Sequence, residues 1–308
     1  MRVLVTGATG FVGRWLVRDL QQAGHDVEGA PASRTLDLSV PGAATSLVSA
    51  AVPDAIVHLA AVSFGPDARR DPDRATTVNV DGTRLLIEAA AAMKRVPGVL
   101  VTGSSEVYGD PSELPLTEEA ALQPSQPYGL SKLQQERVAF KAGAEVGVPV
   151  IVTRAFNHTG PGQRPDFVAP ALAHRVIGAR ASGKTTIRVG NIDVRRDIGD
   201  VRDVVRAYRL LIEGLHSESI SAGTVWNVAT GRGTAIRELL DILAELAGVS
   251  VEPVVDPELV RADDPEEIIG DASRLMNQTG WMAAIPLRTT LSDLLHSLEP
   301  GKEPGATS

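Results

Sequence analysis

Tyr128 and Lys132 are the two residues whose types and spacing could perform chemistry in this chain. In a helix, side chains four residues apart lie on one face, one turn from each other. A free tyrosine loses its proton at about pH 10, and a neighbouring ammonium lowers that pKa because it favours the phenolate. The pair therefore predicts a tyrosine general acid/base assisted by a lysine. Because ordinary helix surfaces show the same spacing, this interpretation depends on the rest of the chain.

Ser104 is the third residue that could take part in this chemistry. Residues 98–102 form an apolar run that predicts a buried strand, and Ser104 follows it closely. In open α/β sheets the active residues gather at the carboxyl ends of the strands. We therefore expect Ser104 to face a substrate beside Tyr128.

A glycine-rich turn near the N-terminus predicts a dinucleotide site. Residues 2–6 have the pattern of a buried strand, and residues 13–23 that of an amphipathic helix. Between them Gly7, Gly10 and Gly13 stand at the spacing G-x-x-G-x-x-G. The glycines permit a tight turn and close approach of a pyrophosphate, which the N–H groups at the start of the helix would bind.

The segment after the second expected strand, residues 25–30, indicates which cofactor the chain prefers. An NAD-specific protein usually has Asp or Glu here to bind the ribose 2′-hydroxyl, whereas this chain has Ser33 and Arg34. These side chains could hold a 2′-phosphate through charge-assisted hydrogen bonds, so we expect NADP(H) to be favoured over NAD(H). The alternative is that Arg34 is a solvated loop residue. Asp37 stands where it could bond the adenine amino group.

The order of strand and helix patterns predicts an α/β fold, a doubly wound Rossmann-type parallel sheet with a smaller, interleaved C-terminal α/β lobe. A third strand at residues 55–61 ends in the small residues Ala60 and Ala61, which lets the backbone pass a cofactor. We expect His58 in this strand to be a core histidine and not a catalyst. Further strands are expected at residues 148–154 and 225–229, and long helices at residues 83–93 and 127–144.

The loosening of the strand–helix alternation after the fifth strand predicts the domain boundaries. We expect a Rossmann domain at residues 1–165, to which residues of about 199–233 return, and a substrate lobe at residues 166–298. Residues 299–308 are rich in Pro and Gly and are expected to be disordered.

Composition excludes several classes of function. The 308 residues include no cysteine, which excludes disulfides, thiolate catalysis and a Cys-ligated zinc site; we expect no metal site. A net charge of −8 argues against nucleic acid as a partner, and no apolar run is long enough for a membrane span. We expect a cytoplasmic protein without a signal peptide. The two long alanine-rich helices could pack against a partner's pair, which predicts a homodimer.

Five motifs occur in an order that no single one could establish, and in sum they resemble the extended short-chain dehydrogenases/reductases that act on nucleotide sugars. They are Thr6-Gly7-x-x-Gly10-x-x-Gly13, His58-Leu59-Ala60-Ala61, Asn79-Val80-x-Gly82-Thr83, Ser104-Ser105-x-Val107-Tyr108-Gly109 and Tyr128-x-x-Ser131-Lys132. Within that family, residues 154–163, 191–197 and 261–273 resemble the branch that acts on GDP-mannose derivatives, which includes a 4,6-dehydratase and a 4-keto reductase.

The resemblance implies a role for each matching residue. Tyr128 is the general acid/base, Lys132 holds the nicotinamide ribose, and Ser104 bonds the sugar oxygen. The implied cofactor contacts also include Gly7, Thr9, Gly10, Phe11, Val12, Gly13, Ser33, Arg34, Asp37, Leu38, Leu59, Ala60, Ala61, Asn79 and Thr102. The implied contacts to a GDP-sugar are Ser104, Ser105, Glu106, Asn157 at the pyrophosphate, Phe167 and Val168 at the guanine, and the cations Arg196 and Arg261. A salt bridge from Arg196 to Asp193 or Asp197 is the alternative for that arginine.

Glu106 keeps two reactions open. A 4-keto reductase needs one proton donor, whereas a 4,6-dehydratase also needs a base for the C5 proton, and Glu106 stands where such dehydratases carry their glutamate. Against a dehydratase, the chain is short, and residues 157–163 lack the Glu and paired Arg of that enzyme's loop. We therefore expect an enzyme that reduces GDP-4-keto-6-deoxy-D-mannose to GDP-D-rhamnose. The alternatives are a 4,6-dehydratase, a 4-epimerase and a cofactor-binding protein without catalysis.

Overall fold

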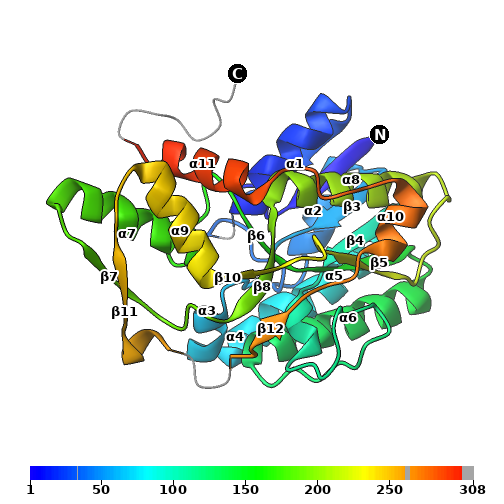
Figure 1. Ribbon diagram of the computed structural model, residues 1–308. Coiled ribbons are helices and arrows are strands. Elements are labelled where there is room, and N and C mark those ends of the chain that lie inside the picture. Colours follow the sequence, from blue (N-terminus) through cyan, green and yellow to red (C-terminus); the bar gives the residue numbers. More distant parts are fainter. Residues whose placement is uncertain (33, 261–263, 300–308) are drawn as a thin grey trace.

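The computed structural model describes residues 1–32, 34–260 and 264–299 of the chain. A parallel six-stranded sheet forms its centre (Figure 1). In spatial order the strands are β2 (Asp26–Gly29), β1 (Arg2–Thr6), β3 (Ala55–His58), β4 (Gly98–Thr102), β5 (Val150–Ala155) and β9 (Val225–Val228). The order reverses between β1 and β3, so a crevice is expected above the carboxyl ends of these two strands. The predicted α/β fold with a parallel central sheet is confirmed.

The central strands are mostly apolar, as expected of strands that helices cover on both faces of the sheet. Val3 and Val5 of β1 belong to one hydrophobic cluster, and Leu4 between them belongs to another. The first cluster includes residues of α1 (Phe11–Gln22) and α8 (Val201–His216), and the second those of α2 (Ala43–Ala51), α5 (Gly82–Ala91) and α6 (Pro127–Val146). Successive strand residues point to opposite faces, so a strand buried on both sides needs no polar alternation.

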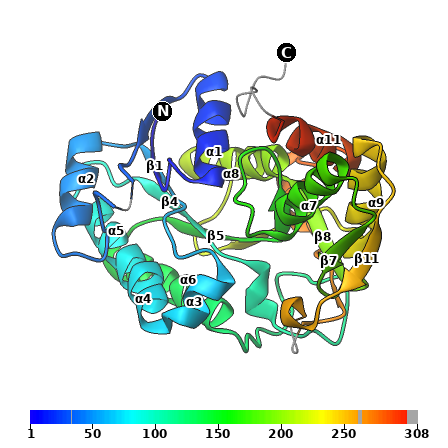
Figure 2. The same cartoon turned by 90° about the vertical axis from the view of Figure 1, so that its left-hand side faces the viewer.

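A second layer of structure follows β5 in the chain and lies beside the carboxyl ends of the sheet (Figures 1 and 2). Its core packs α7 (Val168–Ser182), α9 (Ile236–Ala247) and α11 (Leu287–Ser297) together. Its strands are β6 (Asn157–Thr159), β7 (Thr186–Val189), β8 (Arg195–Asp200), β10 (Gly233–Ala235), β11 (Glu252–Val255) and β12 (Glu267–Ile268). Between β8 and β10 the chain runs through α8 and β9, which pack in the central layer. The division into two domains at particular residues stays a prediction.

Several short elements connect these layers. They are α3 (Gly65–Arg70), α4 (Pro72–Thr76), the π-helix η1 (Thr77–Asp81), the 3₁₀ helices η2 (Ser105–Tyr108) and η3 (Pro257–Leu259), and α10 (Ser273–Thr279). The helix expected at residues 83–93 begins at Gly82 and continues η1 directly, a π-helical turn that hydrophobic periodicity did not indicate. The strand expected at residues 55–61 ends at His58, because the three residues after it bend across the glycine turn.

Candidate active site

Tyr128 lies in the first turn of α6, where Pro127 begins the helix. Its side chain is buried against Ala68 and Ala75, with Val62 packed on the same cluster. Burial raises the pKa of Tyr128, the charge of Glu106 raises it further, and a hydrogen bond with Ser104 opposes both effects. The expected lowering of this pKa by Lys132 is therefore wrong for this structure, because desolvation of the phenol dominates. At neutral pH the side chain is a proton donor.

Lys132 lies one turn further along α6 and is 2% exposed. Its Nζ donates to the carbonyl oxygen of Thr102 at 2.9 Å and to Oε1 of Gln135 at 2.9 Å. The same Nζ is 5.9 Å from the centroid of the Tyr128 ring. Burial lowers the pKa of Lys132 to about 7, because the ammonium leaves water without a carboxylate partner among the described residues.

Ser104 reaches this pair from the carboxyl end of β4. It is buried, has an extended backbone, and accepts a hydrogen bond from the backbone N–H of Glu106 at 3.2 Å. That bond begins η2, in which Ser105 is buried and Glu106 is exposed. The structure thus brings Ser104, Tyr128 and Lys132 together from two elements, as the sequence predicted, with Glu106 beside them.

The glycine turn after β1 forms a cradle that other residues would fill. Gly7 has a φ of +70°, and a Cβ on it would lie 2.9 Å from the backbone nitrogen of Ala60. A Cβ on Gly13 would lie 2.2 Å from the carbonyl oxygen of Gly7. Gly10 is the N-cap residue of α1, and no side chain caps that helix end. The first N–H groups of α1 are thus available to an anion, which fits the pyrophosphate of a dinucleotide. Thr9 lies in this same turn, and Phe11 and Val12 begin α1.

The predicted adenosine side of the site is described only in part. Ser33 lies outside the described residues, and Arg34 is exposed. Asp37 accepts hydrogen bonds from the hydroxyl and backbone N–H of Ser39, which lower its pKa, so part of its acceptor capacity serves its own loop. Leu38 is buried in the core.

Two predicted cofactor residues organise the backbone around the cradle. The amide of Asn79 accepts from the N–H of Val62 and donates to the carbonyl oxygen of Val62 and to the hydroxyl of Ser131. Asn79 therefore ties the loop after β3 to α6. Thr102 donates its hydroxyl to the carbonyl oxygen of His58 and accepts from Lys132. His58 itself is fully buried, as expected of a core histidine.

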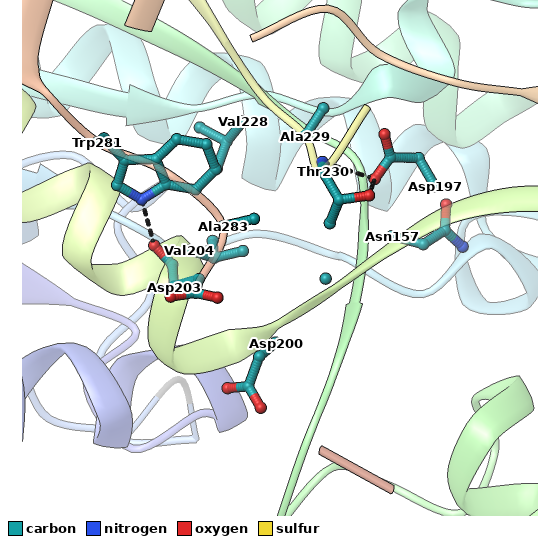
Figure 3. Close-up of a pocket in the computed structure, with 11 residues that line it drawn as sticks. Asn157, Asp197, Asp200, Asp203, Val204, Val228, Ala229, Thr230, Trp281 and Ala283 are labelled. Carbon is teal, nitrogen blue, oxygen red and sulfur yellow. Dashed lines mark hydrogen bonds between the residues drawn. The ribbon is translucent and has the colours of Figure 1, made fainter. Parts of the chain in front are cut away.

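The residues predicted to contact the GDP moiety, apart from those near Ser104, lie on the second layer or just before it. Asn157 of β6 lines a small hollow of about 10 Å³ together with Asp197 and Thr230 (Figure 3). Phe167 precedes α7 and packs against Phe64, with 5.1 Å between the ring centroids, and Val168 beside it is 39% exposed. Arg261 lies outside the described residues.

Arg196 forms an ion pair, but with neither of the neighbours considered from the sequence. Its guanidinium donates to Asp264 at 2.7 Å. Asp193 pairs with Arg237, and Asp197 accepts from Thr230 and other backbone groups. Successive residues of a strand point to opposite faces, so Asp197 cannot reach Arg196 across β8.

A larger hollow of about 310 Å³ is lined in part by Val62, which packs against the cluster that contains Tyr128. Its lining also includes Phe64, Asp67, Arg70, Arg74 and Arg164. Arg164 lies over the Phe64 ring, 5.1 Å from its centroid, and so bridges from the loop before α7 to α3. No motif of the sequence indicated this group, for which the aromatic Phe64 soon after β3 was the available signal.

A buried ionic network lies beside this site, and no sequence motif indicated it. Arg154 of β5 donates twice to Glu136 of α6 and once to the hydroxyl of Tyr108, which donates to Asn227 of β9. Glu136 stands four residues after Lys132, and Arg154 is a charged residue in an apolar strand. These two facts were the available signal.

The described part of the chain holds no group of three or more His, Asp or Glu side chains that could bind a metal ion. Nor does any described helix combine the length and the apolar character that crossing a bilayer requires.

Comparison with known proteins adds independent findings. The chain matches the family described as "NAD dependent epimerase/dehydratase family" over residues 3–229. It is 37% identical over 301 residues to a GDP-6-deoxy-D-mannose reductase of Pseudomonas aeruginosa, with 97% of each chain covered. It is 32% identical over 285 residues to a GDP-6-deoxy-D-talose 4-dehydrogenase of Aggregatibacter actinomycetemcomitans, covering 91% of this chain and 92% of the relative. The solved structure of RMD from Pseudomonas aeruginosa complexed with NADPH is similar with a TM-score of 0.87 and 36% identity, over 96% of this chain and 98% of that chain.

Proposed function

The chain belongs to the NAD dependent epimerase/dehydratase family, and we propose that it reduces the C4 ketone of GDP-4-keto-6-deoxy-D-mannose with NADPH, which yields GDP-D-rhamnose. The family expected from the sequence motifs is confirmed. One observation carries the choice of a reductase: the buried, protonated Tyr128 stands beside Ser104 as a proton donor. The 37% identity to a GDP-6-deoxy-D-mannose reductase supports the substrate class.

In the proposed reaction the side chains act on the ketone oxygen. Ser104 and Tyr128 donate hydrogen bonds to it, which orients the carbonyl and stabilises the charge that develops on its oxygen. A bound nicotinamide cofactor supplies the hydride that adds to C4. Tyr128 transfers its proton to the forming alkoxide, so the ketone gains one hydride and one proton and becomes an alcohol. A raised pKa suits this direction, because Tyr128 then keeps its proton over the whole neutral range.

The cofactor assignment is supported by the cradle and by one relative. The uncapped N-terminus of α1 and the glycine turn fit a pyrophosphate, and Lys132 would hold the nicotinamide ribose. NADP(H) is favoured because Arg34 is exposed after β2 and because the similar RMD structure is complexed with NADPH. NAD(H) is the alternative cofactor.

The GDP moiety is proposed to bind on the second layer. Asn157 and Arg196 would contact the pyrophosphate, and Phe167 with Val168 would lie at the guanine. A chain of net charge −8 needs local cations for a doubly phosphorylated substrate, and arginine binds phosphate with a planar fork. Arg196 would then exchange or share its partner Asp264.

A 4,6-dehydratase is the second candidate, and Glu106 is the observation that favours it. This carboxylate is exposed at the start of η2 and its charge acts on Tyr128, so it could serve as the additional base. The two functions differ in their redox balance. A reductase consumes one NADPH for each ketone, whereas a dehydratase returns the hydride to its substrate and consumes none.

The test supplies the purified protein with GDP-4-keto-6-deoxy-D-mannose and NADPH, and separately with GDP-mannose alone. We expect stoichiometric NADPH oxidation with the keto sugar, a GDP-6-deoxyhexose as product, and no reaction with GDP-mannose. Glu106→Gln should reduce turnover only mildly, because reduction removes no C5 proton. Conversion of GDP-mannose to a 4-keto product without NADPH loss, abolished by Glu106→Gln, would replace the reductase assignment by the dehydratase.

We further propose that the protein is a cytoplasmic homodimer. The long helices α5 and α6 pack side by side, and α6 exposes Leu130 and Ala144, whereas most small side chains of the two helices are buried in the core. Two such pairs can pack about a twofold axis as a four-helix interface.

A further inference from the structure

The side chain of Gln135 lies in the interior between Lys132 and Thr83, and it is 1% exposed. Its Oε1 accepts from Nζ of Lys132 at 2.9 Å, and its Nε2 donates to Oγ1 of Thr83 at 2.9 Å. A buried amide is costly unless both of its ends are satisfied, and here both are. The neighbouring Gln134 on the same helix is exposed. The two glutamines therefore differ only in which face of α6 they occupy.

Hydrogen-bond counting fixes the orientation of the Gln135 amide. The single hydroxyl proton of Thr83 goes to the carbonyl oxygen of Asn79 at 2.6 Å, so Oγ1 of Thr83 can only accept from its other partners. Gln135 must therefore present its NH₂ group to Thr83 and its oxygen to Lys132. The opposite orientation would place an NH₂ group against an ammonium.

The same counting fixes the tautomer of His58, the other partner of Thr83. Nε2 of His58 lies 3.0 Å from Oγ1 of Thr83 and must carry the proton. Nδ1 then accepts from the hydroxyl of Thr6 at 2.7 Å. Burial lowers the pKa of His58 to about 3, with Lys132 as a second cause, so the ring is neutral. Two series of donors thus converge on Thr83, one from Thr6 through His58 and one from Lys132 through Gln135, and they leave the Gln135 amide no freedom to turn.

Lys132 has three N–H donors, and the protein uses two of them. One goes to the carbonyl oxygen of Thr102 and one to Gln135, and the third has no acceptor among the described residues. The titratable groups that face Lys132 are the neutral His58 on β3 and the protonated Tyr128 on its own helix. Two neutral oxygen atoms therefore provide the protein's support for this buried positive charge.

We propose that Gln135 is a positioning residue, which keeps the Lys132 ammonium charged and directs its remaining donor to the nicotinamide ribose. This inference rests on the proposed role of Lys132 in the reductase. In this proposal the neutral amide of Gln135, which Thr83 holds in place, sets the pKa of Lys132. A carboxylate at the same place would hold the charge more strongly, and an apolar side chain would not hold it.

The experiment compares Gln135→Leu and Gln135→Glu with the matched surface controls Gln134→Leu and Gln134→Glu. The dissociation constant of NADPH is measured from nicotinamide fluorescence between pH 6 and pH 10, and the pH dependence of kcat is measured with the keto sugar.

Wild-type affinity for NADPH should fall as Lys132 loses its proton above a pH of about 7. Gln135→Leu should move that midpoint down, Gln135→Glu should move it up by about one pH unit, and the Gln134 variants should not move it. In Gln135→Leu we also expect kcat at pH 7 to fall by about tenfold.

Shifts of the two Gln135 variants in the same direction, or no difference from the Gln134 variants, would overturn the proposal. Should Gln135→Leu not fold, as judged by its thermal transition, Gln135→Glu against Gln134→Glu decides alone, because glutamate keeps the size of glutamine. The NADPH titration needs no sugar. A wild-type protein that binds NADPH but does not reduce the ketone therefore refutes the proposed function and leaves this test intact.

Discussion

Arg154 and Glu136 form an ion pair with two hydrogen bonds, of 2.6 Å and 3.0 Å, in the interior between β5 and α6. Their side chains are 4% and 8% exposed. Because Glu136 follows Lys132 by one helical turn, the pair ties this part of α6 to the sheet. Arg288 and Glu245 also form a pair with two hydrogen bonds, each of 2.8 Å, but on the surface.

Glu136→Gln should destabilise the protein by about 3–5 kcal/mol, because it leaves the Arg154 charge buried without its counter-ion. The midpoint of urea unfolding measures this loss. Glu245→Gln is the matched control, and its midpoint should equal that of the wild type, because water solvates the exposed Arg288. Equal midpoints for both variants would show that the interior pair does not stabilise the helix.

Lys132→Met should raise the melting temperature at pH 6, because the native state then no longer buries an ammonium. The pKa of Lys132 is about 7 when folded and about 10.5 when unfolded. Below pH 7 both states carry the proton and the burial penalty is fully present. Between pH 7 and pH 10.5 the unfolded state binds more protons, so wild-type stability rises with pH relative to the variant. The difference in melting temperature between Lys132→Met and the wild type should thus shrink towards pH 10. Each kcal/mol by which the cost of burying the ammonium falls corresponds to about 2–4 °C. A pH-independent difference between the two proteins would contradict the lowered pKa.

Tyr128→Phe should reduce turnover by about 10²–10⁴-fold, the usual contribution of general acid catalysis. Substrate binding should change little, because the proton is transferred only on the way to the transition state. Steady-state kinetics with the keto sugar and NADPH measure both quantities. A large rise of KM with unchanged kcat would assign Tyr128 to binding.

Arg34→Ala should remove a preference for NADPH over NADH. Loss of hydrogen bonds to a 2′-phosphate costs about 1.5–3 kcal/mol, or roughly 10–100-fold in the dissociation constant. NADH affinity should stay nearly constant in this variant, and Lys94→Ala, which removes an exposed cation just after α5, should affect neither cofactor. If the wild type binds both cofactors equally, Arg34 is a solvated loop residue.

The proposed dimer predicts a molar mass of twice 32.4 kDa in solution. Light scattering at micromolar concentration measures it directly, because the interface between α5 and α6 pairs should persist at that dilution. A mass of one chain would refute the dimer and leave the catalytic proposals unchanged.

The local pattern of residues was enough to predict the fold class and that Ser104, Tyr128 and Lys132 lie together; their catalytic role stays a prediction. The apolar strands, the glycine turn and the Tyr128–Lys132 spacing depend on backbone geometry over a few residues, which any sequence of that pattern shares. Ser104 lies at the carboxyl end of β4, and Tyr128 lies in the first turn of α6, the long helix that follows β4 in the chain. A helix that follows a parallel strand begins at the edge of the sheet where that strand ends, so the two residues meet there. These relationships follow from period and order along the chain, and both can be read without the structure.

Tertiary structure alone decided the electrostatics of the site. The pKa of Tyr128 is raised and that of Lys132 lowered, because both side chains leave water, and no spacing rule reports burial. Arg196 found its partner 68 residues away, and Gln135 its partner 52 residues away. Gln134 and Gln135 are the same residue type at adjacent positions, and only Gln135 contacts Lys132, because only Gln135 faces the core. Long-range contacts and desolvation depend on the whole packed chain, so they determine how the catalytic residues are charged and held.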